Sequence, residues 1–179
     1  MLASNQISRH RLRRSSGNTL IEMAFTLIPT IAILVAFVDF GLVLFRWSTL
    51  QNAVREGARY AITFQRDAAH SLGQTASIQQ VVEKKSMGSV HRTDSPQHIF
   101  VCYASTAAPN TCIPSGGNVP GNIVEVSVKN VTWSWLAPLS GSYSSAVAPF
   151  FRSRSPFNLN VYSADILGGY PVGVNSVVE

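Results

Sequence analysis

Hydrophobic residues are concentrated in one long stretch near the start of the chain. From Thr19 to Phe45 the sequence reads TLIEMAFTLIPTIAILVAFVDFGLVLF, and no charged residue occurs between Met23 and Val38. The apolar residues would cover all sides of a helix, whereas an amphipathic helix carries them on one stripe. A helix of 27 residues extends about 40 Å, and about 20 residues are enough to cross the hydrocarbon core of a bilayer. The pattern therefore predicts a membrane-spanning helix.

The residues that follow this stretch favour a retained span over a cleaved secretory signal peptide. The apolar run is too long for such a signal. The segment Leu44-Phe45-Arg46-Trp47 also lacks the small residues of a signal-peptidase site. We therefore expect the helix to remain in the protein.

Charge is distributed unevenly along the 179 residues, which carry a net charge of +5. Residues 1–17 contain four arginines and no acid, so the remaining chain has a net charge of +1, the difference between +5 and +4. The positive-inside rule then places the N-terminus in the cytoplasm and residues 46–179 on the other side of the membrane. The basic arm is short and lacks interleaved aromatic residues, so the sequence predicts no nucleic-acid partner.

Two carboxylates interrupt the apolar stretch, and a carboxylate at the bilayer centre costs roughly 3 kcal/mol. Glu22 and Asp39 lie near its ends, so one interpretation is that both reach the membrane interface. Glu22 has a second interpretation, because it is the fifth residue after Gly17. If the chain is cut between Gly17 and Asn18, then Asn18 gains a free α-amine. The Glu22 carboxylate could neutralise that amine on a neighbouring subunit, since a lone charge is costly in a medium of low dielectric constant.

The helix is predicted to continue through residues 46–66. Its apolar side is rich in small residues, and Ala53, Gly57 and Ala61 follow one another at intervals of four. Small residues at this spacing allow a second element to approach the helix closely. That element is either the helix of a partner subunit or the sheet of the same chain.

The rest of the chain alternates short helical and strand patterns. Residues 75–86 (TASIQQVVEKKS) predict a helix capped by Thr75 or Ser77. Alternating apolar residues predict strands at 97–104, 122–135 and 157–164. Within the second strand the apolar phase changes after Val128, which predicts a bulge near Asn130. Three such strands indicate a small antiparallel sheet.

Two connecting segments between these strands carry further features. Residues 106–121 are rich in proline, glycine and asparagine and are expected to form a loop. Cys112 lies in this loop and Cys102 in the strand before it, so outside the cytoplasm the two would form a disulfide; otherwise they are two free thiols. Residues 137–155 are expected to be either a flap over the sheet or a surface that binds a partner.

No catalytic motif stands out in the sequence. The histidines have no HxxxH or HExxH spacing, and no GxxxxGK[ST], GxGxxG or GxSxG segment occurs. His91 and His98 are better explained as surface residues than as metal ligands. We therefore expect neither an enzyme nor a cofactor.

Two segments together resemble a known family. A basic leader, Gly17, the segment Asn18-Thr19-Leu20-Ile21-Glu22 and an apolar helix resemble the class III signal of type IV pilins and pseudopilins. The segment LQNAVREGARYA at residues 50–61, after Val38-Asp39-Phe40-Gly41, resembles the TadE-like family of pseudopilins. The resemblance covers roughly residues 15–62.

The resemblance implies an α+β, pilin-like fold, in which a long N-terminal transmembrane helix continues into a small domain with a short helix and an antiparallel sheet of about three strands. The expected organisation is a leader at 1–17, a span at 18–45 and a periplasmic or extracellular domain at 46–179. Family membership implies a minor pilin or pseudopilin of a tight-adherence (type IVc) pilus in the bacterial inner membrane, which acts in pilus assembly, priming and adhesion.

The partners that this family implies are other pilins and pseudopilins, a prepilin peptidase, the inner-membrane assembly platform and membrane lipid. The alternative is an uncleaved single-pass protein whose outer domain binds a component of the cell envelope. The two hypotheses differ in what the span does, because the alternative uses it only as an anchor.

Overall fold

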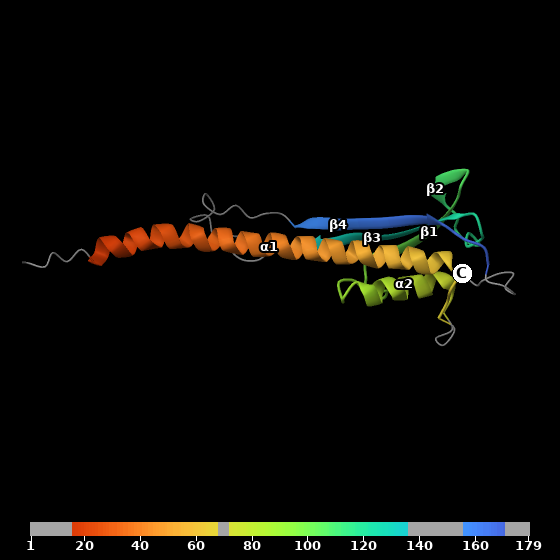
Figure 1. Ribbon diagram of the computed structural model, residues 1–179, viewed down its shortest axis with the longest axis horizontal. Helices are drawn as coiled ribbons and strands as arrows, with labels where there is room; N and C mark the ends of the chain where they lie inside the picture. The colour runs from red at the N-terminus through yellow and green to blue at the C-terminus, as the bar shows by residue number, and fades with distance from the viewer. Residues whose placement is uncertain (1–15, 68–71, 136–155, 171–179) are drawn as a thin grey trace, which may run out of the picture.

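The computed structural model describes residues 16–67, 72–135 and 156–170. This part of the chain contains two helices and four strands, and the fold is the α+β, pilin-like arrangement that the sequence predicts (Figure 1). The helices are α1 (Ser16–Ile62) and α2 (Gln74–Lys85), and the strands are β1 (Ile99–Ser105), β2 (Ala108–Cys112), β3 (Ile123–Trp133) and β4 (Phe157–Ile166). The predicted flap at 137–155 and most of the leader lie outside the described residues.

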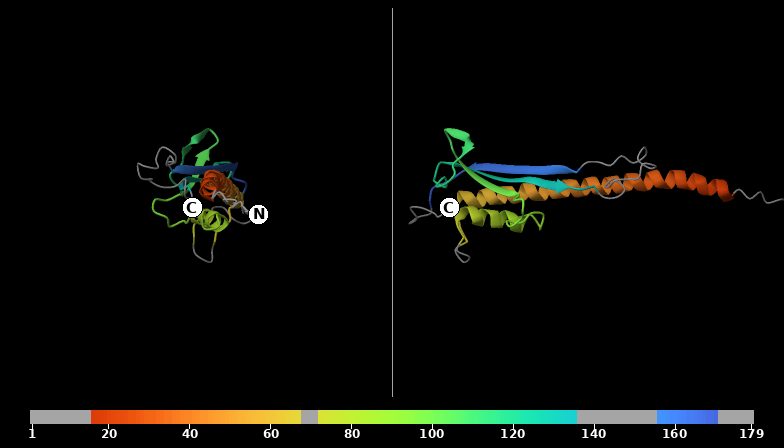
Figure 2. Two further views of the ribbon diagram at one scale, coloured as in Figure 1. Left: turned by 90° about the vertical axis from the view of Figure 1, so that its left-hand side faces the viewer. Right: turned by 180° about the vertical axis from the view of Figure 1, so that it is seen from behind.

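Helix α1 dominates the shape of the molecule. It has 47 residues and is therefore about 70 Å long. It runs without a break from the apolar stretch into the predicted post-membrane segment, and it includes Pro29. Its second half is covered by the sheet on one side and by α2 on the other, whereas its first half extends well beyond both (Figures 1 and 2).

The sheet is antiparallel, with the strand order β2-β1-β3-β4. Strand β3 is central, and the register between β3 and β4 shifts between Val128 and Val131. Within this shift, Asn130 has a φ of 61°, a left-handed conformation that asparagine tolerates better than most residues. Its backbone N–H donates to Asn160 Oδ1 at 2.8 Å. The predicted bulge near Asn130 is thus confirmed.

Strand β2 was not predicted, because residues 106–121 have the composition of a loop. It is a short edge strand that pairs only with β1, with Ala104 opposite Cys112. All five of its residues are exposed, so no alternation of buried and exposed positions marks it. An edge strand also tolerates a proline, which explains how Pro109 is accommodated.

Helix α2 begins one residue before the predicted start, and this changes its cap. Gly73 is the N-cap and provides no side-chain hydrogen bond, so the prediction of a Thr75 or Ser77 cap is wrong. Both hydroxyls lie inside the helix. Ser77 Oγ donates to Gly73 O at 2.8 Å, and Thr75 Oγ1 lies 3.2 Å from the Tyr103 hydroxyl.

The hydrophobic core lies between the sheet and the two helices. From β3 it receives Val124, Val126 and Val128, all fully buried. These side chains pack with buried residues of both helices, namely Leu50, Val54, Ile78 and Val82. Burying a valine or leucine contributes about 1.5–3 kcal/mol, so this cluster fixes the second half of α1 to the domain.

Candidate functional site

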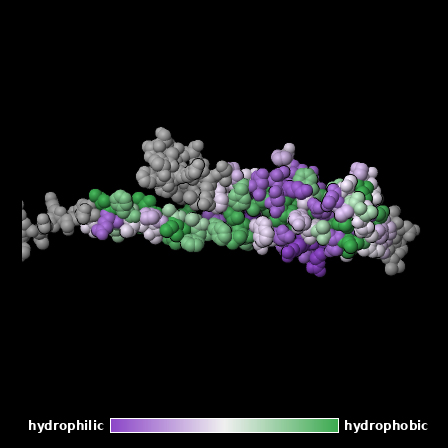
Figure 3. All heavy atoms as spheres, turned by 90° about the horizontal axis from the view of Figure 1, so that it is seen from above, coloured by the Kyte–Doolittle hydropathy of each residue, from purple (hydrophilic) through white to green (hydrophobic). Residues whose placement is uncertain are grey.

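The first half of α1 extends beyond α2 and the sheet (Figure 1). Its large apolar side chains are mostly exposed, as shown by Phe25 at 78 % and Leu20 at 70 %. Hydrophobic residues line this half of the helix, whereas hydrophilic residues gather over the sheet (Figure 3). Among the described residues, Thr19–Ile62 is the one helical segment long and apolar enough to span a membrane.

The predicted processing and docking residues all lie at the start of this exposed half. Gly17 and Asn18 are in the first turn of α1, which begins at Ser16, and Glu22 is one turn further along and exposed. Within the part of the chain that the structure describes, no basic side chain forms an ion pair with Glu22. The Glu22 carboxylate is thus accessible to a group from another molecule.

Asp39 is placed differently from Glu22. Its side chain is fully buried, with 0 % exposure, whereas Glu22 is exposed; the position of both acids at the membrane interface stays a prediction. At helical spacing Asp39 lies on the same side of α1 as Arg46, Leu50 and Ala53. The covered stripe of α1 therefore extends beyond the sheet-packing half and into the apolar stretch.

The small residues of α1 face the interior of the same chain. Ala53 and Ala61 are fully buried. A Cβ atom at Gly57 would lie 2.6 Å from Val82 Cγ2 and 3.3 Å from Val126 Cγ1. Of the two alternatives left by the sequence, the structure therefore has the small residues packed against α2 and β3 rather than exposed to a partner helix.

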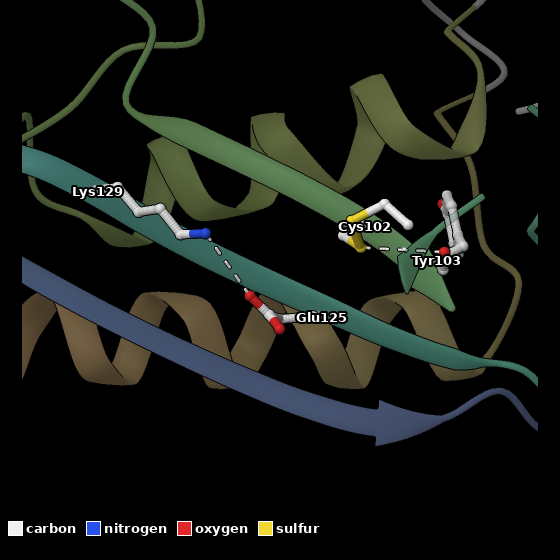
Figure 4. The surroundings of a disulfide bond; sticks show 5 residues. Cys102, Tyr103, Glu125 and Lys129 are labelled. Carbon is white, nitrogen blue, oxygen red and sulfur yellow. Dashed lines mark hydrogen bonds and ion pairs between the residues drawn. A yellow bond between two sulfur atoms is a disulfide. The ribbon is translucent and has the colours of Figure 1, made fainter. Parts of the chain in front are cut away.

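A disulfide joins Cys102 of β1 to Cys112 of β2, with a Cα–Cα distance of 5.4 Å. It ties the edge strand to the sheet (Figure 4). On the same outer surface Lys129 Nζ lies 3.9 Å from Glu125 Oε1 and 5.9 Å from the centre of the Phe100 ring. These residues border a groove of about 430 Å³ beside the disulfide.

The junction between α1 and α2 contains a polar cluster that the sequence did not indicate. The backbone N–H of Asp67 donates to Ser77 Oγ at 2.9 Å. Burial raises the pKa of the Tyr60 hydroxyl, the nearby Asp67 carboxylate raises it further, and a hydrogen bond with Ser77 opposes the rise. A tyrosine with a raised pKa stays protonated at neutral pH, so the Tyr60 hydroxyl remains a neutral hydrogen-bonding group there.

A second polar group missed by the sequence lies deeper in the same junction. Gln74 is fully buried, and its Nε2 donates to Ala61 O at 3.0 Å. Its Oε1 accepts from Asn118 Nδ2 at 3.1 Å. Because the last carbonyls of a helix lack intrahelical partners, Gln74 satisfies one end of α1. No pattern distinguishes Gln74 from Gln79 and Gln80 in the sequence.

The two candidate metal ligands have ordinary partners. His91 Nδ1 lies 3.0 Å from Glu83 Oε1, and His98 Nδ1 lies 3.0 Å from Lys129 O. No group of three or more potential metal ligands occurs among the described residues. Among the described residues, the candidate functional surface is therefore the exposed half of α1 with its first turns.

The exposed apolar half of α1 and the folded domain around its other half together define a class of protein. A long helix with an uncovered apolar half, whose other half is packed under an antiparallel sheet, is the architecture of a membrane-anchored, pilin-like protein.

The comparison with protein families makes the class more specific. Residues 17–59 match the family model described as TadE-like protein, which confirms the resemblance seen in the sequence. The matched segment begins at Gly17, includes the whole exposed half of α1 and ends beyond Gly57. It supports a pilus-associated protein of the tight-adherence system. No curated protein and no solved structure matches the chain.

Proposed function

We propose that the protein is a minor pilin or pseudopilin of a tight-adherence (type IVc) pilus, which acts in assembly or priming of the pilus and in adhesion. The observation that carries this proposal is the division of α1. The half that is exposed and apolar lies within the family match, whereas the other half is fixed to a folded domain. Such a helix can leave the membrane and pack among similar helices without disturbing the domain.

Processing would create the form of the protein that assembles. In this proposal a prepilin peptidase removes residues 1–17, residues 18–45 span the inner membrane, and residues 46–179 form the outer domain. The arginines of the leader keep the N-terminus in the cytoplasm. The partners are other pilins and pseudopilins and the assembly platform that extracts the subunit.

Glu22 would guide docking by pairing with the new α-amine of a neighbouring subunit. The accessibility of its side chain and its position one turn from Asn18 support this role. Removing one partner of an ion pair in a medium of low dielectric constant costs about 3 kcal/mol or more, and 1.4 kcal/mol corresponds to a tenfold change in binding.

We expect Glu22→Gln to leave cleavage intact and to reduce co-assembly with companion pilins at least about tenfold. Co-purification from cells that contain the companion subunits and the peptidase measures this effect. Glu56→Gln is the matched control, because Glu56 lies on the same helix and pairs with Arg59 of its own chain. Equal co-assembly of the two variants would refute the docking role of Glu22.

The alternative function, an uncleaved anchored binding module, makes the opposite prediction for the span. It requires only that residues 18–45 be apolar, so an unrelated span of equal length should preserve function. The pilin proposal expects the same replacement to abolish co-assembly, because the exposed half of α1 is the docking surface.

A further inference from the structure

The point where the exposed half of α1 meets the folded domain contains a hollow of about 380 Å³. It is lined by Phe45, Arg46 and Thr49 from α1, by Met87 and Ser89 from the turn after α2, and by Trp133 at the end of β3. Three separate elements thus converge at the first basic residue that follows the apolar stretch. The position corresponds to the outer surface of the membrane if α1 is inserted.

The hollow contains an arginine that is only partly used by the protein. Arg46 Nη2 donates to Ser89 O at 3.2 Å, and its guanidinium carbon lies 5.8 Å from the centre of the Trp133 ring. Arg46 Nε and Trp133 Nε1 are enclosed, and neither meets an acceptor among the described residues. Arginine has five N–H donors, so the guanidinium retains the capacity to bind a further acceptor group.

The surroundings of the hollow are those of a membrane interface. Met87 is 77 % exposed, and the large side chains of Phe45 and Trp47 are also exposed. Tryptophan is enriched at the level of lipid headgroups. Exposed apolar groups beside the positive charge of Arg46 match an anionic lipid, whose headgroup is negative and whose chains are apolar.

We propose that this hollow binds the phosphate of an anionic phospholipid in the outer leaflet of the membrane that α1 spans. The guanidinium of Arg46 binds two phosphate oxygens, as its planar fork allows. The Trp133 ring stays beside the guanidinium, and the acyl chains follow Phe45 along α1. The site sets the height of the domain above the bilayer. This inference rests on the membrane insertion included in the proposed function, but not on cleavage or pilus assembly.

The test is lipid retention by the full-length protein, measured by native mass spectrometry after extraction in mild detergent. Phosphatidylglycerol is the probe, with phosphatidylcholine and inorganic phosphate as comparison ligands. We expect phosphatidylglycerol to bind more tightly than both, and Arg46→Gln to weaken its binding about tenfold, as expected for a charge-assisted hydrogen bond. Arg55→Gln is the control, because Arg55 is exposed on the same helix, away from the hollow.

Equal phosphatidylglycerol binding by Arg46→Gln and Arg55→Gln would overturn the proposal. So would binding of inorganic phosphate as tight as that of the lipid, because the site would then be a plain anion site. Recovery of each variant in the membrane fraction is scored separately, so a failure of insertion is distinguished from a failure of the lipid site.

Discussion

Gly57→Leu is expected to lower the free energy of unfolding by about 3 kcal/mol. Even a single Cβ atom at this position would lie 2.6 Å from Val82 Cγ2, and leucine adds three further carbons. The valine methyl cannot swing away, since β-branched side chains are restricted at χ1. Replacing glycine inside a helix gains only about 1 kcal/mol of helix propensity. This gain is smaller than the cost of overpacking, so the net effect is destabilising. Urea denaturation in detergent, followed by tryptophan fluorescence, measures the change.

Gly41→Leu is the matched control for this experiment. Gly41 lies in the same helix, and no atom lies within 4 Å of the position of its Cβ. We expect this variant to unfold at the same urea concentration as the parent protein or at a slightly higher one. If Gly57→Leu were as stable as Gly41→Leu, then α1 would not be packed against α2 and β3 at Gly57.

Gln74→Ala is expected to cost about 3 kcal/mol of unfolding free energy. The truncation removes two buried hydrogen bonds, the one that Gln74 donates to the carbonyl of Ala61 and the one that it accepts from the amide of Asn118. A buried polar group that loses its partner costs about 1–3 kcal/mol, and the cavity left by the side chain adds to this cost. The loss falls at the end of α1, where the helix meets α2.

Gln80→Ala is the appropriate comparison, because Gln80 is on the same helix and only partly buried. Substitutions at such positions usually change stability by less than about 0.5 kcal/mol. The two variants are compared by urea denaturation and by hydrogen exchange at the end of α1. Similar unfolding curves would show that the contacts of Gln74 contribute little to stability.

Much of the fold could be predicted because it follows from periodic patterns. The alternation of Val124, Val126 and Val128 indicates the central strand, and the change of phase after Val128 indicates the bulge at Asn130. The long apolar run indicates the exposed half of α1. In each case the pattern reflects what surrounds the side chain, which is water, lipid or the interior of the protein.

The rest depends on contacts between residues that are distant in the sequence. Strand β2 exists because Ala108–Cys112 pairs with β1 and is tied to it by a disulfide, and its own residues carry no alternation. In the sequence Gln74 looks like Gln79 and Gln80 of the same helix. Only the fold places it against the end of α1, where it is buried. Asp39 is buried although its position near the end of the apolar stretch suggests the membrane interface. The role of Arg46 at the hollow requires Ser89 and Trp133 to be brought together by the fold.

The division of α1 explains how one helix can serve two environments. Its second half is held by a core of large and small side chains, so the domain is stable whether the first half lies in lipid or among other helices. Among the described residues, most side chains of its first half are exposed, so few contacts within the chain would be lost if this half left the membrane. The proposed exchange of lipid for neighbouring helices therefore places no demand on the folded domain.

The N-terminus of the mature protein tests this account most directly. The protein is expressed together with a prepilin peptidase of a tight-adherence system, extracted from the membrane and examined by intact mass and N-terminal sequencing. The account predicts a chain that begins at Asn18 and lacks residues 1–17, still with α1 and its domain attached. A chain that retains residues 1–17 in the presence of an active peptidase would contradict it.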